Sequence, residues 1–241
     1  MPRRPAGDLL CDELDDEGVG VDLNRNFPFE WKPENEQAGA GPYPTSEVEI
    51  RATVDFITCH PNINIAITYH TFSGVILRPF STRPDDKMDV NDLWVYELMG
   101  ERGKTLTGYK CVSVYHDFRY HPTEVTTGAF DDWVYDHLGI FAFTVELWDL
   151  PGRAGIEDRK FIEWFRKHPH EDDVKILRWL EANAPADALV GWYAYEHPQL
   201  GPVELGGLNR MYTFRNPPHH LMGEEAEKNT PWALALADML P

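Results

Sequence analysis

Four short apolar runs divide the chain and predict β-strands. They cover residues 63–71, 75–80, 109–115 and 140–148. The first run is rich in β-branched residues and the last is apolar and aromatic, which is typical of strands buried on both faces. We therefore expect residues 63–71 to form a buried strand and residues 140–148 to form a central one.

Helices are predicted between and after these runs, over residues 89–106, 129–138, 171–183 and 224–240. Gly108 and Gly139 follow the first two of them, as expected at helix C-termini. Thr45-Ser46 followed by Glu49 has the spacing of a capping box and predicts a further helix that ends near residue 58. Strands that alternate with helices indicate α/β layers around a largely buried sheet.

Residues 189–206 break this alternation. Apolar and polar positions alternate there and include Gly and Pro, which suggests a small β segment. We expect residues 1–185 to form an α/β domain and residues 186–241 to form a C-terminal extension, with a short β segment and a helix.

The overall charge narrows the range of partners. Forty acidic residues against 22 basic ones give a formal net charge of −18, which argues against nucleic acid as a partner. No apolar run reaches about 18 residues, so no membrane span is expected. The first residues lack the apolar stretch of a secretion signal, and three scattered cysteines do not make a disulfide framework. The cytoplasm is the default compartment, while localisation and oligomeric state stay open.

Three short segments contain candidate site residues. Asn24-Arg25 could grip a carboxylate, because a guanidinium forms two parallel hydrogen bonds with it; a solvated turn is the alternative. His70 ends an apolar strand, where α/β proteins place ligands, and imidazole binds zinc or serves a structural role. Glu146 lies in an apolar strand, so it is either paired or kept for proton transfer.

These segments resemble the zinc carboxypeptidase family, peptidase M14, related to carboxypeptidases A and B. The resemblance covers roughly residues 1–150 and depends on motifs in family order: Gly20–Phe27, Pro44-Thr45-Ser46-Glu47, His70, Gly128 with Asp131-Asp132-Trp133, and Phe143–Leu147. It implies a mixed, mostly parallel twisted sheet with helices on both faces.

The resemblance also implies roles for single residues. His70 matches the third zinc ligand, and Glu146 matches the base that activates water. Asn24 and Arg25 match the pair that holds the substrate's terminal carboxylate. Arg3, or Arg4 after a one-residue shift, matches the arginine that stabilises the oxyanion. Asp131 matches a position in the specificity pocket and would favour a C-terminal Lys or Arg; it could equally cap the helix that follows.

Two departures from the family pattern stand out. The family's first two zinc ligands form a His-x-x-Glu motif upstream of the Asn-Arg pair, but no histidine precedes Asn24. The two His-x-x-Glu sequences present, at His121 and His168, come after His70 and contain proline. Glu124 occupies the position of the family's mobile tyrosine and is a candidate substrate-binding residue, with Tyr120 as a nearby substitute. We expect an N-terminally truncated domain, whose exposed sheet edge would make it unstable or pair it with another copy.

The resemblance implies a zinc-dependent metallocarboxypeptidase that hydrolyses the C-terminal peptide bond of peptides or proteins. The cofactor would be one zinc ion, whose site is incomplete in this chain. Two alternatives stay open: a non-catalytic module that binds C-terminal carboxylates, and a zinc amidohydrolase of the same fold.

Overall fold

A four-stranded sheet forms the centre of the computed structural model, which describes residues 20–121, 123–185, 188–209 and 213–239. The strand order is β1-β4-β2-β3. Strand β1 is parallel to β4, β2 is parallel to β3, and β2 is antiparallel to β4. The sheet is therefore mixed with parallel pairs in the majority, as predicted. Its strands are β1 Ile65–Thr71, β2 Val75–Arg78, β3 Lys110–Ser113 and β4 Phe141–Leu147.

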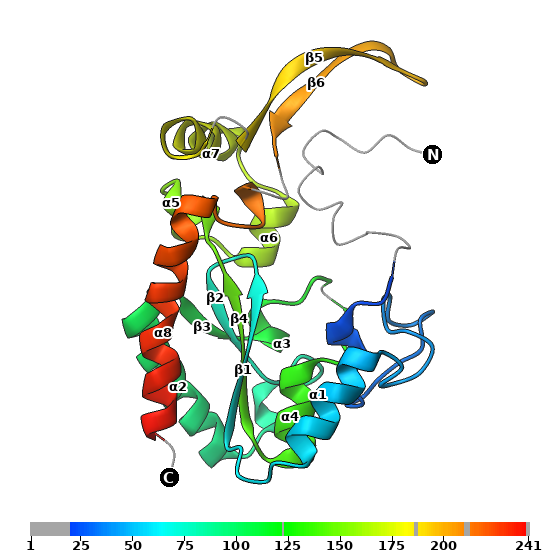
Figure 1. Cartoon of the computed structure of the whole chain (residues 1–241), viewed down its shortest axis with the longest axis vertical. Helices are drawn as coiled ribbons and strands as arrows, with labels where there is room; N and C mark the ends of the chain where they lie inside the picture. The colour runs from blue at the N-terminus through cyan, green and yellow to red at the C-terminus, as the bar shows by residue number, and fades with distance from the viewer. Residues whose placement is uncertain (1–19, 122, 186–187, 210–212, 240–241) are drawn as a thin grey trace.

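Helices cover both faces of the sheet, which confirms the predicted α/β layers. Figure 1 shows α2 and α8 on one side of the strands and α1 and α4 on the other. The helices are α1 Val48–Thr58, α2 Val90–Thr107, α3 Val114–Asp117, α4 Phe130–Leu138, α5 Leu150–Arg153, α6 Phe161–Arg166, α7 His170–Asn183 and α8 Met222–Met239. Short 3₁₀ turns span Leu23–Arg25, Asp85–Lys87 and His219–Leu221. No helix in the described ranges is both long enough and apolar enough to cross a bilayer.

A two-stranded antiparallel hairpin projects from one end of the molecule (Figure 1). It consists of β5 (Leu189–His197) and β6 (Gly201–Leu208), where the sequence predicts a β segment. The chain then returns as α8, which packs against α2 and inserts Trp232 and Leu236 into the main core. The domain boundary at residue 185 stays a prediction.

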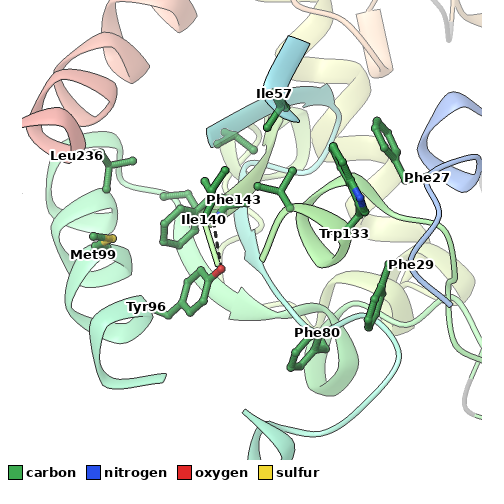
Figure 2. Close-up of a cluster of buried hydrophobic side chains, with 14 of the residues drawn as sticks. Phe27, Phe29, Ile57, Phe80, Tyr96, Met99, Trp133, Ile140, Phe143 and Leu236 are labelled. Carbon is green, nitrogen blue, oxygen red and sulfur yellow. Dashed lines mark hydrogen bonds between the residues drawn. The ribbon is translucent and has the colours of Figure 1, made fainter. Parts of the chain in front are cut away.

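The main core lies beside the β4 strand and joins distant segments. Figure 2 shows Phe27 beside Trp133 and Tyr96 beside Phe143. The Phe27 and Trp133 rings stack with centroids 5.4 Å apart, so the segment around residue 27 is fixed to α4. The Tyr96 hydroxyl accepts a hydrogen bond from the Ala142 backbone at 3.1 Å, which satisfies a polar group inside apolar surroundings.

Three local predictions were wrong. Strand β1 has β4 as its only neighbour in the described sheet, so it is an edge strand with partly exposed side chains and is not buried. Helix α1 begins at Val48 without a side-chain cap, because Ser46 donates to the Glu47 carboxylate instead. The predicted 109–115 strand ends at Ser113, whose hydroxyl accepts from the His116 backbone and starts α3.

Candidate active site

The carboxyl ends of β1 and β4 bring His70 and Glu146 together. The two residues are register partners on adjacent parallel strands. Their side chains approach to 3.9 Å between His70 Nδ1 and Glu146 Oε1, while His70 Nε2 lies 3.1 Å from the Thr68 hydroxyl. Strand pairing, rather than a loop, therefore sets the distance between these two groups.

The Asn24-Arg25 pair lies in a 3₁₀ turn that is held from both sides. The Asp22 carboxylate accepts from the Asn24 backbone at 2.8 Å, and the Asn24 side-chain oxygen accepts from the Phe130 backbone at 2.8 Å. The second bond satisfies a free N–H group at the start of α4. Arg25 has a side chain that is only 14 % exposed, and its Nη2 lies 3.5 Å from Asp22. A freely solvated turn, the alternative interpretation, does not describe this pair.

Gly128 allows the turn to approach α4 closely. Its φ is +69°, a conformation that side chains rarely adopt, and a Cβ at this position would lie 2.2 Å from the Arg25 carbonyl oxygen. The Phe27 backbone donates to the Gly128 carbonyl at 3.1 Å. The glycine is thus part of what positions Arg25.

Three buried polar atoms in this region have no hydrogen-bond partner within 3.5 Å among the described residues. They are Glu146 Oε2, Asp131 Oδ2 and Thr144 Oγ1. Thr144 and Glu146 lie on the same face of β4 because they are two residues apart, and Thr144 lies beside the Asp131 carboxyl group. The Thr144 hydroxyl can donate to the Asp131 carboxyl group beside it, so Glu146 Oε2 is the acceptor left without a donor, and an unpaired buried acceptor is costly.

The local environment shifts the protonation of these groups. Burial raises the pKa of Glu146 to about 8; the charge of Arg25 opposes this shift, and Asp22 and Asp131 add to it. Burial also raises the pKa of Asp131, against the effects of Thr144 and Arg25. Burial lowers the pKa of His70, which keeps the imidazole neutral near neutral pH. A neutral imidazole beside a carboxyl group that titrates near pH 8 is suited to proton exchange.

Other predicted site residues lie elsewhere or have a different local role. Arg3 is outside the described residues. Glu124 is exposed and lies 3.7 Å from His121, and no contact in the described chain joins it to Arg25. Asp131 does not cap α4: the N-cap residue is Ala129, and the Asp131 carboxylate accepts from its neighbour Asp132 at 3.1 Å.

Sequence reasoning missed Asp22 and Thr144 and treated Tyr120 only as a substitute for Glu124. Tyr120 interacts with the Arg25 side chain, and burial together with the charge of Glu146 raises its pKa to about 12. The period of two along β4 could have revealed Thr144, because it shares a strand face with Glu146. Tyr120 had no comparable signal, because a loop brings it to the site.

The described residues do not fit a catalytic zinc site. Such a site needs three protein ligands, and no cluster of three or more His, Cys, Asp or Glu side chains in the described ranges could hold a metal. The later His-x-x-Glu sequences do not supply it. His168 stacks on Trp164 and pairs with Asp173 at 2.9 Å, and His121 contacts the Thr123 hydroxyl at 3.0 Å and the exposed Glu124 at 3.7 Å.

The α/β fold and this group of residues define a carboxypeptidase-like protein, and comparison with known proteins agrees. The family model "Zinc carboxypeptidase" matches residues 3–162, and the chain belongs to this family. Carboxypeptidase A5 of Macaca fascicularis is 32 % identical over 145 residues, covering 57 % of this chain and 32 % of that protein. Carboxypeptidase B2 of Rattus norvegicus is 33 % identical over 147 residues, covering 57 % and 34 %.

The chain therefore spans about a third of the length of these curated relatives. Among solved structures, that of thrombin activatable fibrinolysis inhibitor matches 70 % of this chain and 44 % of its own, with 27 % identity and a TM-score of 0.45.

Proposed function

We propose that this site binds the C-terminal residue of a peptide or protein, as the substrate-holding part of a metallocarboxypeptidase. Arg25 and the Asn24 amide nitrogen hold the terminal carboxylate, and a basic side chain of the ligand reaches Asp131. The observation that carries this assignment is the pair of buried carboxyl groups, Glu146 and Asp131, that feel the charge of Arg25, with Glu146 Oε2 lacking a hydrogen-bond partner among the described residues. A guanidinium or ammonium group from the ligand would supply the missing donors.

Glu146 is proposed as the general base. The carboxylate form of Glu146, which predominates above its pKa of about 8, can take a proton from water and return it to a leaving amine. Hydrolysis in this family also uses zinc, to which the described residues contribute His70 as one ligand at most. Binding is therefore the part of the activity that this chain can be tested for directly.

Calorimetry with acetyl-Gly-Arg, its C-terminal amide and acetyl-Gly-Phe tests the binding site. We expect acetyl-Gly-Arg to bind best and the amide to bind at least about tenfold more weakly, because the charged hydrogen bonds to Arg25 are lost. Arg25→Gln should weaken binding of the free acid to the level of the amide. Asp131→Asn should remove the preference for Arg over Phe.

Arg178→Gln, which alters an exposed arginine on α7, serves as the matched control and should bind like the wild type. Equal affinity for the acid and the amide would contradict the assignment of Arg25.

A second candidate function is a module that binds C-termini without hydrolysing them. The lack of a three-ligand metal cluster in the described chain favours it. We expect no tight, stoichiometric zinc in the purified protein after dialysis, measured by elemental analysis. Stoichiometric zinc that disappears in His70→Ala would contradict the non-catalytic alternative and support the enzyme.

A further inference from the structure

The turn that follows β4 holds a tryptophan in an unusual backbone conformation. Trp148 comes two residues after Glu146 and has a φ of +68°, in the left-handed region that a bulky residue rarely adopts. Such a conformation is unfavourable by itself and persists only where the surrounding structure holds it. The contacts of Trp148 therefore determine the direction in which the chain leaves Glu146.

Hydrogen bonds hold the Trp148 backbone from two sides. Its N–H group donates to the Tyr109 hydroxyl oxygen at 3.1 Å, and its carbonyl accepts from the Ser73 backbone at 3.0 Å. Ser73 comes three residues after His70. The turn is thus bonded to the segment that follows His70 and is continuous with the strand that carries Glu146.

The Trp148 side chain is fully buried. Its Nε1 donates to the Thr213 carbonyl at 2.9 Å, the Trp179 ring packs edge-on with centroids 5.9 Å apart, and the Arg153 guanidinium lies 5.0 Å from the ring centroid. Thr213 and Trp179 come after residue 162, where the family match ends. Part of what holds this turn is therefore supplied from outside the matched segment.

Glu225 of α8 orients the hydroxyl group to which Trp148 donates. The Glu225 side chain is 3 % exposed; one of its oxygens accepts from the Tyr109 hydroxyl, and the other accepts from Arg153 Nη2 at 2.7 Å. Burial acts to raise the pKa of Glu225, but the hydrogen bonds from Tyr109 and Arg153 outweigh burial and lower this pKa. Because a carboxylate can only accept, the Tyr109 proton points to Glu225 and the lone pairs of the hydroxyl oxygen are left for Trp148.

We propose that Glu225 is a positioning residue for Glu146, acting through Tyr109 and Trp148. The inference rests on the proposed role of Glu146 in the ligand site. Loss of the Glu225 carboxylate frees the Tyr109 hydroxyl to rotate, which weakens its hold on the strained turn at Trp148. A displacement of about 1 Å at a reacting group can cost up to about a hundredfold, so helix α8 of the C-terminal extension contributes to the geometry of the site.

Calorimetry of acetyl-Gly-Arg with Glu225→Ala and Glu224→Ala tests this role. Glu224 is the matched control, because it also accepts from Arg153 Nη2 at 2.7 Å but has a side chain that is 59 % exposed. We expect Glu225→Ala to bind at least about tenfold more weakly than wild type and Glu224→Ala to bind like wild type, with both variants shown to be folded by urea unfolding. A Glu225→Ala protein that unfolds more easily but binds like Glu224→Ala would overturn the proposal, because Glu225 would then only stabilise the fold.

Tyr109→Phe makes the same test without removing a charge. Its control is Tyr135→Phe, which also loses a hydrogen bond from a tyrosine to a carboxylate, that of Asp92 at 2.8 Å. Tyr109→Phe should weaken binding as Glu225→Ala does, and the double variant should bind about as well as either single variant, because both residues act through one path. Losses that add in the double variant, or an equal loss in Tyr135→Phe, would contradict this path.

Hydrogen exchange tests the positioning without a ligand. The amides of Ser73 and of residues 146–148 should exchange faster in Tyr109→Phe than in wild type, and at the wild-type rate in Tyr135→Phe. Unchanged exchange at these amides in Tyr109→Phe would overturn the proposal. Equal binding of acetyl-Gly-Arg and its amide to wild type would instead contradict the proposed function, and hydrogen exchange would then decide the positioning by itself.

Discussion

The charge state of Glu146 is coupled to the stability of the fold. Its pKa is about 8 in the folded chain, against about 4.3 in an unfolded one, so the folded state binds more protons between these values. The free energy of unfolding therefore falls as pH rises from about 4.5 to about 8. Glu146→Gln should remove this pH-dependent loss of stability. At pH 9 it should therefore be more stable than wild type, by up to about 1.4 kcal/mol for each unit by which folding raises the Glu146 pKa.

Thermal unfolding at pH 5, 7 and 9 measures this effect. The two proteins should differ least at pH 5 and most at pH 9. Glu124→Gln, at an exposed glutamate, should leave the pH dependence unchanged. A pH profile of Glu146→Gln that parallels wild type would show that the carboxyl group is not the titrating group.

At this residue scale, the sequence predicted His70, Glu146, Asn24 and Arg25, and the structure places these four residues around one site. Their patterns are local: each lies at the end of a strand or in a short motif. The sequence did not predict that the Asp131 carboxyl group is buried beside Thr144, because that depends on how α4 lies against β4. The proximity of Tyr120 to Arg25 was not predicted either, because it depends on the path of a loop.

At the scale of elements, Gly128 fixes the distance between the Arg25 turn and α4. Gly128→Ala should destabilise the protein by more than the roughly 1–2 kcal/mol that a left-handed alanine costs, because its Cβ would displace the Arg25 carbonyl. It should also weaken binding of acetyl-Gly-Arg. Urea unfolding and calorimetry measure the two effects.

Gly139→Ala is the matched control. Its φ is +67°, but a Cβ there would meet nothing within 4 Å, so only the conformational cost should appear and binding should be kept. Equal losses in both variants would show that the contact with Arg25 is unimportant.

Prediction of the elements succeeded for long periodic segments. It failed where the burial of a strand depends on which other strands lie beside it. The α2 and α4 helices appear within a residue or so of their predicted bounds, because spacing and a terminal glycine encode them locally. The apolar β1 run suggested burial on both faces, yet strand order placed it at an edge. Nothing in the seven residues of β1 specifies how many strands lie beside it.

At the scale of the whole molecule, α8 joins the chain's last described residues to the sheet core. Leu236 is fully buried in the main cluster, whereas Leu234 on the same helix is exposed. Leu236→Ala should cost about 2–5 kcal/mol, and Leu234→Ala should change stability by less than about 0.5 kcal/mol.

Urea denaturation followed by both tryptophan fluorescence and circular dichroism measures these costs. We expect one transition that moves to lower urea in Leu236→Ala for both probes. A separate early transition that alone responds to Leu236→Ala would show that α8 unfolds independently of the sheet.

The pairing of β1 with β4 also has a consequence for synthesis. Residue 70 is made 76 residues before its register partner, residue 146, so at about 5–20 residues per second the ribosome takes roughly 4–15 s to supply that partner. During this interval the uncharged, β-branched β1 segment lacks β4, the strand that it pairs with in the described sheet. The nascent chain is therefore most prone to wrong pairing before β4 emerges, and His70 and Glu146 come together only after that period has passed.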